Sequence, residues 1–290
     1  MVRGPSHDFL GMQLYFTQGC VTISMKKYIM EIIETFPDEK KHTHAETPAA
    51  VTLFTVRKDY SLLPSSKIKV FHTFVAKLLY LAKRARPDIA CAVDFLSTRV
   101  LYPDADDWNK LVRCIRYLVS YPDIYLKLSA DKLMLQKWWI DASYANHVDC
   151  KSHTGSVMSL GNGGVFSHST KQKINTRSST EAELVGVDDM MGHVLWTKAF
   201  ITGQGYTSPE TVIYQDNRSA ILLETRGQSN AGKRSKHIAV RYYFVKDKVD
   251  SNEFAINWCP SNEMFGDYFT KPLQGEMFFR FRNFIMNSFG

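Results

Sequence analysis

The chain has 290 residues, of which 44% are hydrophobic and 22% charged, so it can bury one large core or two moderate ones and is not a disordered tail. Its net charge of +7 favours a polyanionic partner such as a nucleic acid. Its five cysteines lack the close spacing of a zinc site or a disulfide framework, which predicts free thiols in an intracellular, cytoplasmic setting, and no membrane partner is expected because no apolar run is long enough to cross a bilayer.

The first part of the chain predicts a small sheet followed by a helix and a loop. Residues 13–16 and 21–24 are strand-like runs on either side of a turn at Gly19, and a helix-like run follows as far as residue 36. Residues 37–64 are polar and contain few periodic apolar side chains, which is typical of a linker or a long loop.

Three amphipathic helices are predicted next. Residues 71–86, 87–100 and 106–120 each place apolar side chains at helical spacing. Pro87 suits the first turn of the second helix, because an N–H at that position would have no helical partner in any case. We therefore expect a mainly helical region that continues to about residue 132.

From residue 133 onward the pattern becomes that of a mixed α/β domain. An apolar run ends on Asp141, and residues 154–160 and 165–169 then form two strand-like runs. These runs are connected by Asn162 and the glycines around it, which accept positive φ at little cost and therefore indicate a hairpin.

Acidic residues recur at strand ends and on helices in this region. Glu183 lies in a helix-like run that begins near Ser178, and Asp216 ends a second short apolar run. Asp267 lies in a helix-like run, residues 261–269, that follows one more strand candidate. Together with Asp141, these residues can meet at one sheet edge, where carboxylate oxygens bind hard divalent cations.

Six motifs surround these acids in a fixed order. They are WIDAS at 139–143, KSHTG at 151–155, SSTEAE at 178–183, YQDNRSAI at 214–221, KHIAVRY at 236–242 and DYFTKPL at 267–273. In sequence and in order they resemble the RNase H part of the Pol polyprotein of copia-type LTR retrotransposons, and KRARPDIA at 83–90 matches a further signature of that family.

The resemblance implies an α/β fold class, with an RNase H-like mixed sheet and flanking helices preceded by a mainly helical region. Residues 1–36 would be the C-terminal end of the reverse transcriptase palm, residues 37–132 the thumb/connection region and residues 133–290 the RNase H-like domain. The rest of the Pol polyprotein, with the palm and fingers, would then be a partner.

The implied activity is metal-dependent endonucleolytic hydrolysis of the RNA strand of RNA–DNA hybrids, which makes the hybrid the expected substrate. Asp141, Glu183, Asp216 and Asp267 would be the catalytic residues and the ligands of two Mg²⁺ ions, for which Mn²⁺ can substitute. Many RNases H also carry a histidine in the loop before the last aspartate. Residues 258–263 contain none, as in the copia pattern, so we expect a slower or metal-only mechanism.

Three motifs have competing interpretations. Thr180 to Glu183 fits a capping box, in which the glutamate would serve the helix start and not a metal. Asp188 and Asp189 imitate part of a polymerase motif, but they lie inside a predicted helix, where a solvated face is the favoured interpretation, and no polymerase site is expected in this chain. His147, Cys150 and His153 are spaced like zinc ligands without a fourth, which is a weak signal.

A basic segment precedes the last long helix-like run. Its residues Lys233, Arg234, Lys236 and His237, with Arg241 further on, predict contacts to a nucleic-acid backbone; the alternative is a solvated helix start.

Two rival functions remain open. One is a non-catalytic nucleic-acid-binding remnant of a retroelement. The other is a DNA-cutting enzyme of the same superfold, such as an integrase, which a glutamate on the helix after the hairpin disfavours.

Overall fold

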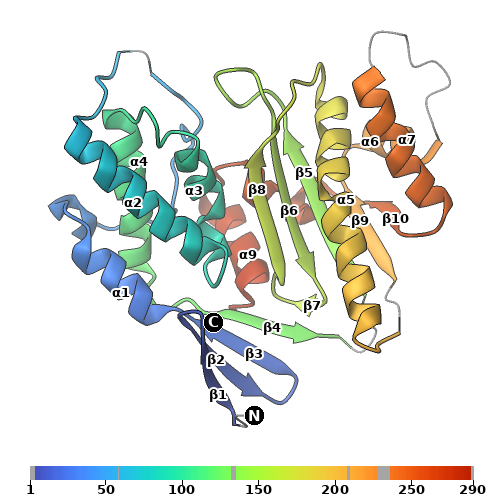
Figure 1. Ribbon diagram of the computed structural model, residues 1–290, viewed down its shortest axis with the longest axis horizontal. Coiled ribbons are helices and arrows are strands. Elements are labelled where there is room, and N and C mark those ends of the chain that lie inside the picture. Colours follow the sequence, from blue (N-terminus) through green and yellow to red (C-terminus); the bar gives the residue numbers. More distant parts are fainter. Residues whose placement is uncertain (1–3, 58, 132–134, 208–209, 227–235, 289–290) are drawn as a thin grey trace. The chain divides into compact units, whose positions relative to one another are not determined.

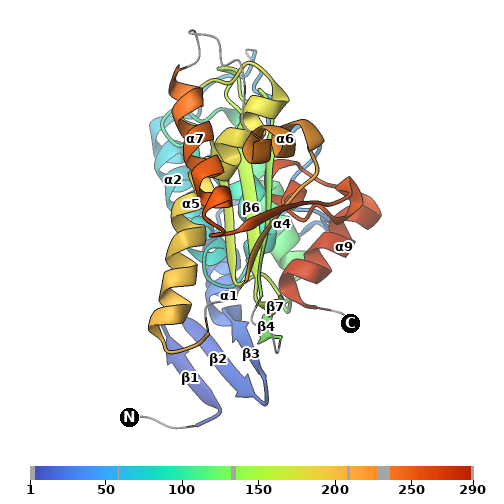
Figure 2. The ribbon, with the colours of Figure 1, turned by 90° about the vertical axis from the view of Figure 1, so that its right-hand side faces the viewer.

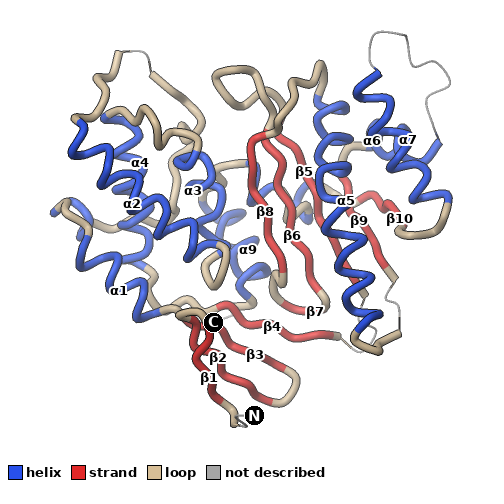
Figure 3. Tube along the Cα trace, viewed as in Figure 1, coloured by secondary structure: helices blue, strands red, loops and turns tan. Residues whose placement is uncertain are grey.

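The computed structural model describes residues 4–57, 59–131, 135–207, 210–226 and 236–288, without the side chains of residues 226 and 236–239 (Figures 1 and 3). The chain divides into two compact units. Unit one contains residues 1–129, 162–164 and 271–290, and unit two contains residues 130–161 and 165–270.

Unit one combines a sheet with helices. Its sheet has the strand order β1-β2-β3-β4-β7, in which β1 to β4 pair antiparallel. The strands are β1 (Ser6–Phe9), β2 (Met12–Thr17), β3 (Cys20–Ser24), β4 (Leu126–Ala130) and β7 (Gly161–Asn162), and the helices are α1 (Lys26–Thr35), η1 (Glu39–His42), α2 (Ser65–Ala82), η2 (Pro87–Ile89), α3 (Ala90–Ser97), α4 (Ala105–Ser120) and α9 (Gly275–Met286).

The helical core of unit one contains a buried ion pair. Arg86 is 0% exposed and donates two hydrogen bonds to the Asp88 carboxylate, at 2.9 and 2.8 Å. Tyr117 of α4 donates a third, at 2.7 Å. These bonds satisfy charges whose burial would otherwise be very unfavourable, which explains why arginine and aspartate flank Pro87 in the KRARPDIA motif.

Unit two is built on a mixed five-stranded sheet with the order β10-β9-β5-β6-β8. β5 pairs antiparallel with β6 and parallel with β9, β6 pairs antiparallel with β8, and β9 pairs parallel with β10. The strands are β5 (Gln136–Ser143), β6 (His153–Ser159), β8 (Phe166–Lys171), β9 (Thr211–Gln215) and β10 (Ala255–Trp258), and the helices are α5 (Ser179–Gly203), α6 (Arg218–Arg226), α7 (Lys236–Asp250), η3 (Ser261–Glu263) and α8 (Asp267–Thr270).

The helices of unit two cover both faces of its sheet. α5 lies along one face, with α7 on the same side (Figure 2), and the side chains of Trp138, Ile140 and Ile213 pack there with the apolar stripe of α5. Successive side chains of a strand point to opposite faces, so Trp139 and Asp141 face the other side, where α8 packs on β5 and β6. The predicted α/β fold class, a mixed sheet with flanking helices, is confirmed.

The C-terminal end of unit two differs from the prediction. One helix was expected over residues 261–269, but the structure has η3 and α8, separated at Gly266. A Cβ at Gly266 would lie 3.0 Å from the Cβ and the backbone N of Asp141. The helix is therefore interrupted where the backbone passes directly against β5.

The compact units also differ from the predicted boundaries in one respect. Unit two begins close to the expected start at residue 133 but ends at Thr270, and residues 271–290 group with unit one. The physical reason is the packing of α9, where Phe278 lies edge-on to Tyr117 with their ring centroids 5.9 Å apart. The assignment of these units to reverse transcriptase and nuclease parts stays a prediction.

Candidate metal centre

Asp141 is held at the end of the central strand of unit two. It is 2% exposed and lies opposite Gly155 in the β5–β6 register. The hydroxyl of Thr270, on α8, donates a short hydrogen bond to Asp141 Oδ2. A buried carboxylate needs such a partner, because burial without one strongly disfavours its charged form.

Glu183 faces β5 from the first turns of α5. It is 5% exposed, and its Oε2 accepts a hydrogen bond from the backbone N–H of Ala142 at 2.9 Å. The capping alternative is wrong, since the N-cap is Ser178, whose hydroxyl accepts from the N–H of Glu181. The side chain of Glu181 accepts from the backbone N–H of Arg177 at 2.8 Å, so Glu181 serves the helix start.

Asp216 follows β9 directly and is partly buried. Ser261 donates a hydrogen bond to its Oδ2 at 2.8 Å, and the indole N–H of Trp258 donates to its backbone carbonyl at 3.2 Å. The parallel pairing of β9 with β5 and β10 brings the ends of these strands together, which places Asp216 beside residues far away in the sequence.

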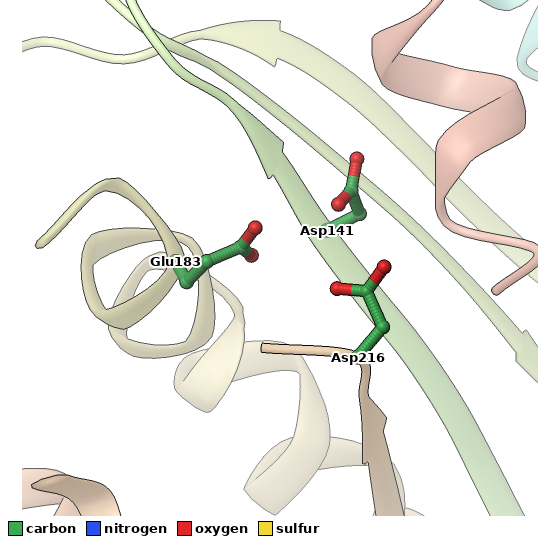
Figure 4. Close-up of side chains that lie close together, drawn as sticks. All are labelled: Asp141, Glu183 and Asp216. Atoms are coloured by element: carbon green, nitrogen blue, oxygen red, sulfur yellow. The ribbon is translucent and has the colours of Figure 1, made fainter. Parts of the chain in front are cut away.

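These elements bring Asp141, Glu183 and Asp216 into one group (Figure 4). Each offers a carboxylate oxygen, and the three oxygens lie within 4.8 Å of one another. Three carboxylates this close repel one another unless a cation lies between them. Oxygen donors of this kind suit Mg²⁺ or Mn²⁺ and not the softer metals that prefer thiolate or imidazole.

Asp267 lies nearby but outside this group. It begins α8 and is 6% exposed. Burial, and then the charges of Asp216, Glu263, Asp267 and Asp141, raise the pKa of the Cys259 thiol to about 12, so these carboxylates act on one small region. Cys259 is therefore a neutral thiol near pH 7 and not a nucleophile.

Sequence patterns missed the hydroxyls of Thr270 and Ser261 and the indole of Trp258, which hold two of these aspartates. The only sequence signal for them is position, because Thr270 lies inside the DYFTKPL motif and the other two lie shortly before it, within residues 258–263. Hydroxyl residues are too common for their type alone to indicate such a role.

The predicted basic contacts are only partly visible. Lys233 and Arg234 lie outside the described residues, as do the side chains of Lys236 and His237. Arg241 is described, and its guanidinium lies 2.5 Å from Asp188 Oδ2 and 2.9 Å from Asp189 Oδ1.

This ion pair corrects the interpretation of Asp188 and Asp189 as a solvated helix face. Their side chains are only 17% and 29% exposed, and they bind Arg241 of α7. Burial raises the pKa of Asp188, while the charge of Arg241 acts in the opposite direction. The pair therefore joins α5 to α7, and the free charge that Arg241 can offer a phosphate is reduced.

The zinc-like trio is not assembled in the structure. His147 and His153 lie side by side, but Cys150 is exposed. Within the described residues, the carboxylate group is the only cluster of three or more ligands that could hold a metal ion. In the same part of the chain, no helix combines the length and the apolar character that a bilayer crossing requires.

Comparisons with known proteins give relatives along nearly the whole chain, although no family model matches. The retrovirus-related Pol polyprotein from transposon TNT 1-94 of Nicotiana tabacum is 30% identical over 92% of the chain. Those from transposons RE2 and RE1 of Arabidopsis thaliana are 30% and 29% identical over 95% and 96% of the chain. The chain spans 19–20% of the length of these relatives.

Solved structures similar to the chain are RNases H. LC11-RNase H1, isolated from compost, is 10% identical, and the match covers 45% of this chain and 87% of that one with a TM-score of 0.34. The same protein in complex with an RNA/DNA hybrid gives 11% identity, coverage of 46% and 92%, and again a TM-score of 0.34. Scores this low add nothing to the fold described above from its strand order.

Proposed function

The chain belongs to the copia-type Pol polyproteins of LTR retrotransposons, of which it spans about a fifth, and from this premise we propose that unit two is a ribonuclease H. It hydrolyses the RNA strand of RNA–DNA hybrids as an endonuclease that depends on divalent metal ions. The observation that supports this most is the group of Asp141, Glu183 and Asp216, drawn from β5, α5 and the end of β9 to within 4.8 Å.

The metal ligands in this proposal are Asp141, Glu183 and Asp216, with Asp267 as a fourth from α8. Two Mg²⁺ ions, for which Mn²⁺ can substitute, would lower the pKa of the attacking water and stabilise the leaving 3′ oxygen. Glu183 would in addition orient that water. Asp188 and Asp189 take no part, because both bind Arg241.

Hydrogen bonds from neighbouring groups hold the three carboxylates in position to bind metal ions. Thr270 holds Asp141, Ser261 holds Asp216, and the Ala142 N–H holds one oxygen of Glu183. Hydrogen bonds of this kind fix the oxygens before substrate arrives, so little reorganisation is needed in the reaction. The hybrid would be selected by its geometry and its 2′-hydroxyls and not by base sequence.

The test is a cleavage assay with the purified full chain and a labelled RNA–DNA hybrid, with Mg²⁺ or with EDTA. A parallel preparation of the Asp141→Asn variant controls for contaminating nuclease. Cuts within the RNA strand that require Mg²⁺ are expected. Binding without cleavage would identify a non-catalytic remnant, and cleavage of duplex DNA would identify an integrase-like enzyme; either result would overturn the proposal.

The wider setting is also part of the proposal. Residues 1–36 would be the end of a reverse transcriptase palm and residues 37–132 its thumb/connection region, acting with the rest of the Pol polyprotein inside the cell. Asp188 and Asp189, which imitate part of a polymerase motif, lie inside α5 and bind Arg241. Primer extension by this chain alone should therefore be undetectable.

Replacing Lys233, Arg234 and Lys236 by Ala should weaken hybrid binding. If the three side chains contact phosphates, the slope of log affinity against log salt should become shallower by about 0.9 for each contact removed. Fluorescence anisotropy at several salt concentrations measures this slope. Arg241→Ala is the comparison, because its ion pairs predict a lower melting temperature and a smaller change of slope than removal of an unpaired cation. An unchanged slope in the triple variant would show that these residues contact no phosphate and form a solvated helix start.

A further inference from the structure

A chain of buried hydrogen bonds in unit two links the loop after β5 to α8. His147 and His153 are 6% and 0% exposed, and His147 Nε2 lies 3.0 Å from His153 Nδ1. His153 Nε2 in turn lies 2.8 Å from the hydroxyl of Ser169, on β8. That hydroxyl donates to the backbone carbonyl of Phe269, on α8, at 2.7 Å.

The last acceptor of this hydrogen-bond series, the Phe269 carbonyl, fixes which atom donates in each of the three hydrogen bonds. A carbonyl can only accept, so the one hydroxyl hydrogen of Ser169 is used on Phe269. Ser169 Oγ must then accept from His153 Nε2–H, and His153 Nδ1 must accept from His147 Nε2–H. His153 is therefore a neutral imidazole, in agreement with burial lowering its pKa well below the usual value. Burial also lowers the pKa of His147 to about 4, so His147 is neutral near pH 7 as well.

The hydrogen-bond series ends on α8, which carries two groups of the metal centre. α8 consists of Asp267–Thr270 only, and a single helical turn has no stability without external contacts. It begins with Asp267, and its Thr270 hydroxyl holds Asp141. The position of α8 therefore decides where two carboxylates point.

Tight packing holds α8 against β6 but does not by itself fix its orientation. A Cβ on Gly155 would lie 2.7 Å from Phe269 Cβ and from Thr270 Cγ2, so the two backbones meet here without an intervening side chain. Packing of this kind is non-directional, whereas a hydrogen bond to the Phe269 carbonyl specifies an angle as well as a distance.

We infer that His153 and Ser169 are positioning residues of the metal centre, which they serve by fixing α8 through the Phe269 carbonyl. His147 fixes the tautomer of His153 by donating a hydrogen bond to its Nδ1. The inference rests on the proposed metal-dependent function. It also accounts for the zinc-like trio of the sequence, because both ring nitrogens of His153 are used in hydrogen bonds and neither remains for a metal.

The test compares two buried serines by calorimetric titration of the full chain with Mg²⁺. Ser169→Ala removes the bond to α8, whereas Ser156→Ala removes a hydroxyl of β6 that donates to Met190 Sδ, at 3.1 Å, on the α5 side. Ser169→Ala is expected to raise the Mg²⁺ dissociation constant about threefold to tenfold, the worth of one buried hydrogen bond. Ser156→Ala should lower the melting temperature and leave Mg²⁺ binding unchanged.

Two variants of His153 give a second readout, including the case in which Ser169→Ala fails to fold. His153→Leu should weaken Mg²⁺ binding as Ser169→Ala does, and His153→Gln, whose amide N–H can still donate to Ser169, should restore most of it. Wild-type Mg²⁺ affinity in Ser169→Ala or His153→Leu, or equal weakening in Ser156→Ala, would overturn the inference alone. A wild-type chain that binds no Mg²⁺ would overturn the proposed function and this inference together.

Discussion

Replacing Glu183 by Gln is expected to slow hybrid cleavage by more than about a hundredfold, because the change neutralises one of three clustered carboxylates that would hold the metal. Glu181→Gln should cleave at a rate within about twofold of the wild type, since the carboxylate of Glu181 accepts an exposed hydrogen bond from the Arg177 N–H and is not in the carboxylate cluster. The two glutamates are two residues apart on α5 and therefore point in different directions, one to β5 and one to the helix start.

The measurement is initial cleavage rate at saturating Mg²⁺, with melting temperatures of both variants recorded to exclude unfolding. Glu181→Gln is a matched control, because it makes the same chemical change on the same helix and weakens only an exposed hydrogen bond to Arg177. If Glu181→Gln were the inactive variant, the assignment of the catalytic glutamate would be reversed. If both remained active, Glu183 would not be a ligand.

Glu224→Gln is expected to stabilise the protein at alkaline pH and to have little effect at pH 5. Glu224 lies on α6, is 0% exposed, and among the described residues neither of its carboxylate oxygens has a hydrogen-bond partner. Burial raises its pKa from 4.5 to about 8. Between these values the folded chain holds more protons than the unfolded chain, so the free energy of unfolding falls as the pH rises through this window.

The size of this effect makes it measurable. Each unit of pKa shift corresponds to about 1.4 kcal/mol, so the buried carboxylate should cost the wild type a few kcal/mol above pH 8. In melting temperature this is a gap of roughly 5 to 10 °C between Glu224→Gln and the wild type at pH 9. Calorimetry at pH 5, 7 and 9 gives the difference at each pH, in which the titration of other groups, including His147 and His153, cancels. A constant difference across the three values would contradict the prediction.

Local sequence patterns predicted the strands of unit two, because apolar runs and the glycine-rich turns between them follow from short-range preferences of the backbone. The apolar run that ends at Asp141 is β5, and the glycines after residue 160 do connect two antiparallel strands. On a helical wheel, Glu183 falls close to the apolar stripe of α5 and Glu181 falls towards solvent, so periodicity alone predicts that Glu183 and not Glu181 faces the sheet. A carboxylate whose direction follows from periodicity alone can be placed without knowing the rest of the fold.

Contacts between distant segments could not be predicted in the same way. Periodicity does not encode which helix packs beside α5, so the pairing of Arg241 with Asp188 and Asp189 was missed. The break between η3 and α8 was missed because its cause, the close approach of Gly266 to Asp141, joins positions far apart in the sequence. The sequence offered the two buried histidines only as members of a weak zinc-like trio with Cys150, and only their packing shows that they bind each other.

The two compact units are interleaved along the chain. It passes from one to the other at residues 129–130, 161–162, 164–165 and 270–271. A single crossover in recombination therefore cannot exchange one unit and leave the other whole: a junction near residue 130 would separate β7 and α9 from the rest of unit one. Residues 162–164 and 271–290 therefore depend for their packing on residues 1–129, although the sequence between them belongs to unit two.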